Sequence, residues 1–437
     1  MEQLEYSSVN EDREQDILAR LRAAPGNISI LLELQAYYKE QARYEEEVAI
    51  LRQLLEKDLS PDERAEALHD LGYALYRQGN LEEAIPRAED LLDTYPGYRY
   101  LGSVYRLLGV MYAERSAWQG DSETEIQDLK TAARHLRYAL GLVEDGQERA
   151  AVLVDLGAVL SNSGELEEAK HIFEEALRIG IEEPNTLVLC YRRLGRTLHT
   201  LGQVDQAISY YEKSASLHSE QPDNSWAMTC IDLAGLYREK GDIERAEQYC
   251  RRAMQWLDQS DAKWASYVLG RIYEELGDIL VQKGAYQEAV DNYYTALQQI
   301  QRPDEQADLY RKLGVTLDRV EQYHQAFEAF RQALVSQTPS APVEKQEDVG
   351  DLLFRMGQCA YKLGDFRQAI VLLEKAVERL KPPLLAEAYL WLGHSYFSTK
   401  RGDRAAGAYK KVIMQTRFLS PTWRQAMRYF VWASMAR

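Results

Sequence analysis

One spaced pattern of small and bulky residues recurs along the chain and limits its possible folds more than any other feature. A Gly, usually preceded by Leu, is followed by Gly at +7, Ala at +12, a bulky residue at +16 and Ala at +19. We call the first Gly the zero residue. Full copies run from Gly157 to Ala176, Gly277 to Ala296 and Gly357 to Ala376. Partial copies have as zero residues Gly72, Gly109, Gly195, Ala234, Gly314 and Gly393, and a weak first copy runs through Leu34, Tyr38, Leu51 and Leu54.

The pattern predicts pairs of antiparallel helices. A Gly at +7 suits the left-handed conformation that ends many helices. Small residues at zero and +12 allow two helices to approach closely, and the residues at +16 and +19 share one helical face. A single pair cannot bury that face, so successive pairs are expected to stack, each touching its neighbours. No segment alternates with period two for long enough to predict a sheet.

The register resembles that of the tetratricopeptide repeat (TPR) family over residues 28–415. The resemblance implies an all-α fold: a right-handed α-solenoid of about ten TPR-type helix pairs, with an N-terminal helix and a C-terminal capping helix. Successive zero residues lie 36 to 48 positions apart, which is longer than the usual period of about 34. In this respect the chain is similar to kinesin-light-chain and spindle-orientation adaptors and to bacterial peptide-sensing Rap-type and regulator solenoids.

The register also predicts how the chain is divided. We expect an acidic N-terminal segment and helix at 1–27, about eight repeats at 28–335, a hinge loop at 336–347, the last two repeats at 348–415 and a capping helix at 416–437. Residues 115–127 are interpreted as an insertion between the paired helices of one repeat. The stretch SQTPSAPVEKQE at 336–347 is the most linker-like part of the chain.

Charge and motifs exclude several classes of function. The net charge of −17 repels polyanions, so no nucleic-acid partner is expected. No apolar run is long enough to span a membrane, which argues against a membrane protein. The polar N-terminus and the absence of a CxxC spacing predict a cytoplasmic protein with reduced thiols. Phosphate-loop, metal-ligand and nucleophile motifs are missing, so we expect no cofactor, no metal and no catalytic residue, hence no enzyme.

The family resemblance implies where a partner would bind. In TPR proteins the first helix of each pair lines a concave groove, at positions −6, −3, +1 and +4 from the zero residue. Carried over, these positions give the candidate partner-binding residues Tyr73, Tyr76, Arg106, Arg192, Arg196, His199, Glu274 and Asp278. The set predicts an aromatic and basic stretch followed by an acidic, mixed one.

Arg192 and Arg196 are four residues apart and share a helix face, so together they can grip a carboxylate. The alternative is a solvated face that neighbouring acids balance. Whether the two arginines already pair within the fold distinguishes the two interpretations.

The C-terminal end differs in charge from the N-terminal end. Residues 391–437 hold nine basic residues and one acid, Asp403, whereas residues 1–100 hold 11 basic and 22 acidic residues. The helix predicted at 421–437 has a packing stripe and, toward the other side, Tyr429, Val431 and Trp432. A candidate docking surface consists of Trp423, Arg424, Arg428 and Trp432. Three interpretations stay open: an ordinary cap, a surface for an acidic partner or for head-to-tail self-association, and contact with an anionic membrane.

These features predict a non-enzymatic scaffold or adaptor that binds a peptide or protein segment in the concave groove. The alternative from another class is a Rap-like sensor whose superhelix changes shape when it binds a signalling peptide. An enzyme, with a site built from distant residues, is the disfavoured third hypothesis.

Overall fold

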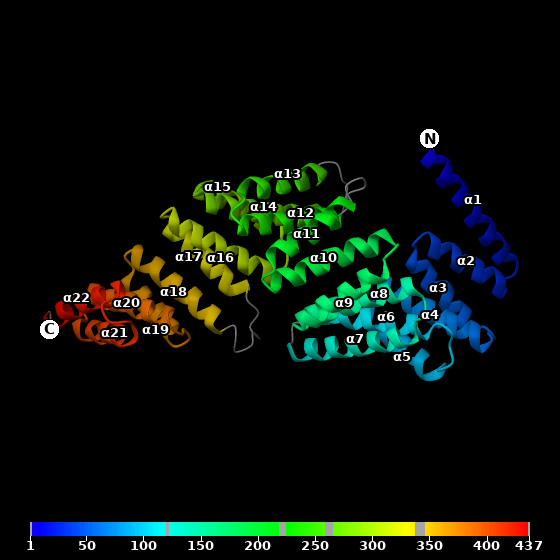
Figure 1. The fold of residues 1–437 in the computed structure, drawn as a ribbon, viewed down its shortest axis with the longest axis horizontal. Coiled ribbons are helices and arrows are strands. Elements are labelled where there is room, and N and C mark those ends of the chain that lie inside the picture. Colours follow the sequence, from blue (N-terminus) through cyan, green and yellow to red (C-terminus); the bar gives the residue numbers. More distant parts are fainter. Residues whose placement is uncertain (1, 119–121, 218–223, 258–264, 337–345, 436–437) are drawn as a thin grey trace. The chain divides into compact units, whose positions relative to one another are not determined.

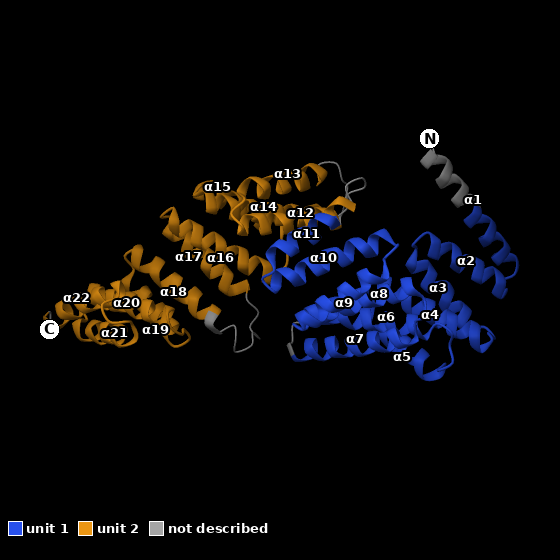
Figure 2. Cartoon of the chain, viewed as in Figure 1, with its two compact units in different colours: residues 1–214 blue, residues 215–437 orange. Residues whose placement is uncertain are grey.

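The computed structural model describes residues 2–118, 122–217, 224–257, 265–336 and 346–435. Every regular element in these ranges is an α-helix (Figure 1). The chain forms two compact units, residues 1–214 and 215–437, which are described separately below (Figure 2).

The helices between the first and the last form ten pairs. The first helices of the pairs are α2 (Ile28–Glu40), α4 (Pro61–Arg77), α6 (Leu101–Trp118), α8 (Gly146–Asn162), α10 (Pro184–Thr200), α12 (Asn224–Glu239), α14 (Ala265–Lys283), α16 (Pro303–Arg319), α18 (Gln346–Lys362) and α20 (Leu384–Ser398). The second helices are α3 (Tyr44–Leu55), α5 (Leu81–Thr94), α7 (Ser122–Leu142), α9 (Leu166–Ile179), α11 (Val204–Leu217), α13 (Ile243–Leu257), α15 (Tyr286–Gln299), α17 (Tyr323–Ser336), α19 (Phe366–Val377) and α21 (Gly402–Gln415).

Two further helices flank the pairs: α1 (Glu2–Ala23) precedes them and α22 (Pro421–Met435) follows them. Within each unit, partners such as α6 and α7 or α14 and α15 pack together, and first helices of successive pairs, such as α6 and α8, also touch. Over the described ranges this confirms the predicted all-α solenoid of ten pairs with a helix at either end.

The repeat pattern has a direct steric basis. A Cβ atom at zero residue Gly157 would lie 2.7 Å from the ring of Phe173, the +16 residue, and one at Gly314 would lie 2.6 Å from Phe330. Only glycine lets the second helix approach so closely. At +7, Gly164 ends α8 with a φ of 86°, in the left-handed region that glycine adopts without strain.

The first pair departs from this rule, which explains its weak sequence signal. Gln35 takes the zero position of α2 and Glu47 takes +12 of α3, and both are buried. The Gln35 amide donates a hydrogen bond of 2.8 Å to the Glu47 carboxylate. A hydrogen-bonded polar pair therefore replaces the small residues of the other pairs, since a buried polar group needs a partner.

The insertion and the hinge are described only in part. Residues 115–118 extend α6 and residues 122–127 begin α7, while 119–121 lie outside the described residues. Arg115 joins the two helices by hydrogen bonds of 2.6 and 2.8 Å to Asp128. Residues 337–345 of the expected hinge also lie outside the described residues, so the hinge stays a prediction.

Within the described ranges, no helix combines the length and apolar composition that crossing a bilayer requires.

Candidate functional site

The first helices α6, α8 and α10 of unit 1 carry several arginines around one carboxylate. We name Arg106, Arg192, Arg193 and Arg196 the arginine cluster. Arg106 Nε lies 2.8 Å from Asp155 Oδ2, and Arg193 Nη1 lies 3.7 Å from Asp155 Oδ1. In the part of the chain that the structure describes, Asp155 is the only carboxylate paired with members of the cluster. The cluster therefore has a local excess of positive charge.

Arg192 and Arg196 themselves lack an acidic partner among the described residues. Arg196 is exposed and donates a hydrogen bond of 2.7 Å to the side-chain oxygen of Asn162, while Arg192 is half-buried. Burial lowers the pKa of the adjacent Arg193, and the charges of Arg192 and Arg196 lower it further against the pull of Asp155. Neither arginine therefore forms an ion pair within the described part of the fold, and a role of the two in binding stays a prediction.

The local sequence explains why α10 is basic on one side. The helix PNTLVLCYRRLGRTLHT contains three arginines and no acidic residue. Its carboxylate, Glu183, lies at the N-cap, where it accepts hydrogen bonds from the free backbone amides. Val188, Cys190, Leu194 and Leu198 are buried, so the arginines lie between buried positions, with His199 exposed near the end of the helix.

The predicted tyrosines lie on α4 of the same unit. Tyr73 and Tyr76 are half-buried, with ring centroids 6.5 Å apart. Arg77 Nη1 donates a hydrogen bond of 2.9 Å to the Tyr73 hydroxyl. Burial, together with the neighbouring Glu114 carboxylate, raises the pKa of Tyr76 to about 12. Both tyrosines also pack partly against the core of unit 1, and a role in ligand binding stays a prediction.

Glu274 and Asp278, predicted as an acidic part of the groove, lie on α14 of unit 2 and are already neutralised. We name Arg238, Glu274, Glu275, Asp278 and Lys312 the charge ladder. Lys312 Nζ lies 2.7 Å from Glu274 and 2.8 Å from Asp278, and Arg238 lies 2.5 Å from Glu275 and 3.5 Å from Asp278. The ladder connects α12, α14 and α16. A role of Glu274 and Asp278 in ligand binding stays a prediction.

The sequence positions used for the groove missed part of both networks. Asp155, Arg193, Glu275 and Lys312 all lie at −2 from their zero residues. For the first network the available signal was the opposite charge of Asp155 and Arg193 at this position of successive pairs. Residues at one register position in neighbouring repeats lie close together in a solenoid, so opposite signs there predict an ion pair, and Asp155 and Arg193 form one. Lys312 pairs instead with Glu274 and Asp278, at −3 and +1.

The last helices of unit 2 hold an aromatic cluster around His394. Its ring centroid lies 4.5 Å from that of Tyr429, and its Nδ1 lies 2.9 Å from the Tyr409 hydroxyl. Trp391 meets the same ring edge-on at 6.2 Å. The prediction that Tyr429 lies toward the outer side of α22 was wrong, because its ring contacts those of His394 and Tyr409 on the packed side of the helix.

Unit 2 is expected to lose stability in mild acid through His394. Burial lowers the pKa of His394 to about 4, whereas an unfolded histidine titrates near 6.5. Between these values the unfolded state binds more protons, so stability falls as the pH falls through this window. We expect a loss of about 1–2 kcal/mol between pH 7 and pH 4.5, in urea unfolding followed by circular dichroism. The His394→Phe variant should lose this part of the pH dependence; the same slope in both proteins would contradict the assignment.

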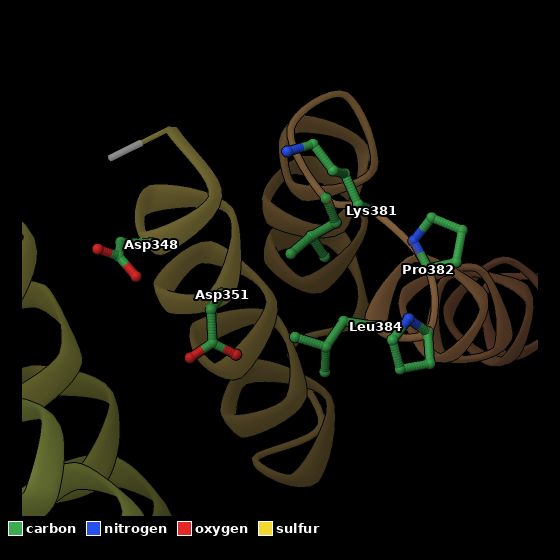
Figure 3. Close-up of a pocket in the computed structure, with 7 residues that line it drawn as sticks. Asp348, Asp351, Lys381, Pro382 and Leu384 are labelled. Carbon is green, nitrogen blue, oxygen red and sulfur yellow. The ribbon is translucent and has the colours of Figure 1, made fainter. Parts of the chain in front are cut away.

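Two hollows lie in unit 2 away from these networks. One, of about 310 Å³, is lined by Asp348, Asp351 and Leu380 to Leu384 (Figure 3). Asp351 is held there by Arg355 at 2.8 Å. The other, of about 730 Å³, lies between α19, α20 and α21. The described residues contain no group of three or more His, Cys, Asp or Glu side chains that could hold a metal ion.

The stacked pairs, glycine-to-ring contacts and charged first-helix faces define a repeat solenoid of the class that presents surfaces to other macromolecules. A model described as the MalT-like TPR region matches residues 116–269, and tetratricopeptide repeat models match 37–99, 268–334 and 354–418. The chain belongs to the tetratricopeptide repeat superfamily. Proteins of this superfamily generally serve as protein-interaction scaffolds.

The chain spans less than a third of the length of the two relatives that it matches by sequence. A kinesin light chain-related protein of Arabidopsis thaliana is 25% identical over 42% of this chain, which covers 31% of that protein. The Tonsoku-like protein of Danio rerio is 25% identical over 41% of the chain, which covers 12% of that protein. A monomeric mutant of IFIT1, solved with Gppp-AAAA, is similar over 98% of this chain and 95% of its own, at 15% identity and a TM-score of 0.51. That likeness is one of fold.

Proposed function

We propose that the chain is a non-enzymatic scaffold or adaptor that binds an acidic segment of a partner polypeptide at the arginine cluster of unit 1. One observation carries the proposal: Arg192 and Arg196 hold their charge without an acidic partner among the described residues, although the chain has a net charge of −17. Two guanidinium groups on one helix face can bind a carboxylate with paired hydrogen bonds.

The surroundings suit a peptide segment. Arg106 on α6 pairs with Asp155 on the adjacent first helix α8. The charge of Arg106 is therefore partly balanced before a ligand carboxylate approaches. Tyr73, Tyr76 and His199 lie on first helices of the same unit and would contact the rest of the segment. The excess positive charge is confined to a few residues of an acidic chain, which fits a short acidic segment better than a long polyanion. A cytoplasmic location and the sensor hypothesis stay predictions.

The test starts from an unbiased random-peptide display library selected on the full chain. We expect enrichment of acidic peptides, bound more weakly as salt rises because exposed charges are screened. The Arg192→Glu, Arg196→Glu double variant should weaken their binding at least about tenfold in fluorescence anisotropy, about 1.4 kcal/mol.

A matched control changes two exposed arginines of the second helices α7 and α9. Arg134→Glu with Arg178→Glu alters the net charge by the same amount, and it should leave the affinity within about twofold. Enriched peptides without acidic residues, or equal losses in both double variants, would sink the assignment to the arginine cluster.

A further inference from the structure

Helix α22 is built like the first helix of an eleventh pair. The Ser420 hydroxyl accepts a hydrogen bond of 3.2 Å from the Trp423 amide, and Pro421 follows at the first helical position. In α4, α8, α10 and α16 the zero residue lies twelve positions after the N-cap residue, which is Ser60, Asp145, Glu183 and Arg302 respectively. The same count from Ser420 reaches Trp432.

In the complete pairs, one face of the first helix is covered. Positions −7, −1, 0 and +3 are buried in α4, α8, α10 and α16. The second helix of the pair covers zero residues such as Gly195, which lies against the Tyr211 ring, and Gly314, which lies against Phe330. In α22 the same four positions are exposed; they are Gln425, Val431, Trp432 and Met435.

The opposite face of α22 is packed, so the exposure belongs to one side of the helix. Ala426 and Ala433 are completely buried, and α22 packs on α21 and touches α20. Among the described residues no helix covers the exposed side. There Trp432 is 51% and Met435 is 78% exposed. We name Arg424, Arg428, Val431, Trp432 and Met435 the open slot.

The chemistry of the open slot differs from that of the ten complete pairs. In nine of the ten pairs the zero residue is glycine or alanine, and a Cβ at Gly157 would already lie 2.7 Å from the opposing ring. The corresponding position of α22 holds the large indole of Trp432. A helix that covers this side must therefore present small or apolar residues to the indole. One and two turns earlier, Arg428 and Arg424 are exposed and pair with no carboxylate in the described part of the chain.

We infer that the open slot docks one amphipathic helix of a partner protein, apolar where it meets Val431, Trp432 and Met435 and acidic where it meets Arg424 and Arg428. The ten pairs show that a helix is the shape this face accepts. The surrounding region 391–437, with nine basic residues and one acid, attracts acidic residues. The slot therefore selects a helix, by shape and by charge together.

A second copy of the chain fits the open slot less well. Apart from α22, α1 is the described helix that lies outside the pairs. Its Ile17 is almost completely buried, and Leu18 and Leu21 pack against the core of unit 1, so these apolar side chains are not available to the slot. A lipid surface fits less well too, because a helix lying in a membrane interface carries its basic residues on a polar face, apart from its apolar one, whereas Arg424 and Arg428 share the exposed side with Trp432.

The experiment uses the full chain carrying Arg192→Glu and Arg196→Glu, so that the proposed peptide site of unit 1 does not contribute. A display library of helical peptides of about five turns, randomised along one face, is selected on this protein. We expect enrichment of helices with large apolar residues at one end and Asp or Glu at the other. In fluorescence anisotropy, adding Arg424→Glu with Arg428→Glu should weaken binding at least about tenfold, and adding Trp432→Ala should do the same.

The control adds Arg367→Glu and Lys375→Glu, two exposed residues of α19 in the same unit, which change the net charge equally. This control should retain the affinity, and thermal unfolding should show that all variants are folded. Four results would overturn the inference. They are no enrichment above background, equal binding after the slot substitutions, self-association that those substitutions abolish, and binding to phosphatidylserine vesicles that they abolish.

Discussion

Replacing Gly157 by alanine is expected to destabilise unit 1 by about 2–3 kcal/mol, although it adds a single methyl group to a helix. The new Cβ would lie 2.7 to 2.9 Å from three ring atoms of Phe173, which is completely buried. Neither helix of the pair can yield without opening the core beneath it. Urea unfolding followed by circular dichroism should show the loss as an earlier transition.

Gly72 provides the matched control because it has the same register position in another pair. A Cβ there would lie 3.8 Å from its nearest neighbour, which is an ordinary contact. Since alanine favours a helix over glycine, Gly72→Ala should be neutral or stabilising by up to about 1 kcal/mol. Equal losses from the two substitutions would show that the zero position is not governed by the contact with the +16 ring.

Lys312→Met is expected to destabilise unit 2 by about 2–3 kcal/mol. Lys312 forms ion pairs with Glu274, which is only 9% exposed, and with Asp278; Arg271 also pairs with Glu274, and Arg238 with Asp278 and Glu275. Without Lys312, two arginines face three carboxylates, so one negative charge is uncompensated in a poorly hydrated place. Removing one partner of a fully buried pair typically costs about 3–5 kcal/mol. We expect less here, since the Lys312 side chain is itself 37% exposed. Hydrogen exchange of the α14 and α16 amides should report the loss locally.

Two further variants decide whether charge is the cause. Arg331→Met breaks an exposed ion pair with Glu328 and should change stability by less than about 1 kcal/mol. Adding Asp278→Asn to Lys312→Met should recover part of the loss, because Arg271 still pairs with Glu274 and Arg238 with Glu275, and no uncompensated charge remains. If the double variant is as unstable as Lys312→Met alone, packing of the lysine stem is responsible instead.

The two proposed surfaces select different shapes of acidic ligand. The arginine cluster lies on a first-helix face of unit 1 and offers guanidinium groups to a carboxylate of a peptide segment. The open slot of unit 2 offers an indole, flanking apolar side chains and two arginines to a preformed helix. Both bindings should weaken with salt, but only the second depends on the helicity of the ligand, which separates the two proposals in solution.

The local pattern in the sequence was sufficient to predict the architecture. Small residues at zero and +12, a bulky residue at +16 and glycine at +7 concern contacts within one helix pair, so their spacing survives in the linear chain. Ten pairs and two flanking helices followed from that spacing. The first pair gave a weak signal because Gln35 and Glu47, joined by a buried hydrogen bond, stand where the other pairs have small residues.

What the sequence could not decide is which charged residues on the first helices are free to meet a partner. Glu274 and Asp278 are neutralised by residues of the neighbouring pairs, whereas Arg192 and Arg196 are not neutralised among the described residues. The open slot likewise depends on which side of α22 already packs on α21. The physical reason is the same in each case: ion pairing and burial across repeats depend on how side chains of separate pairs meet in space, and only the tertiary structure determines that.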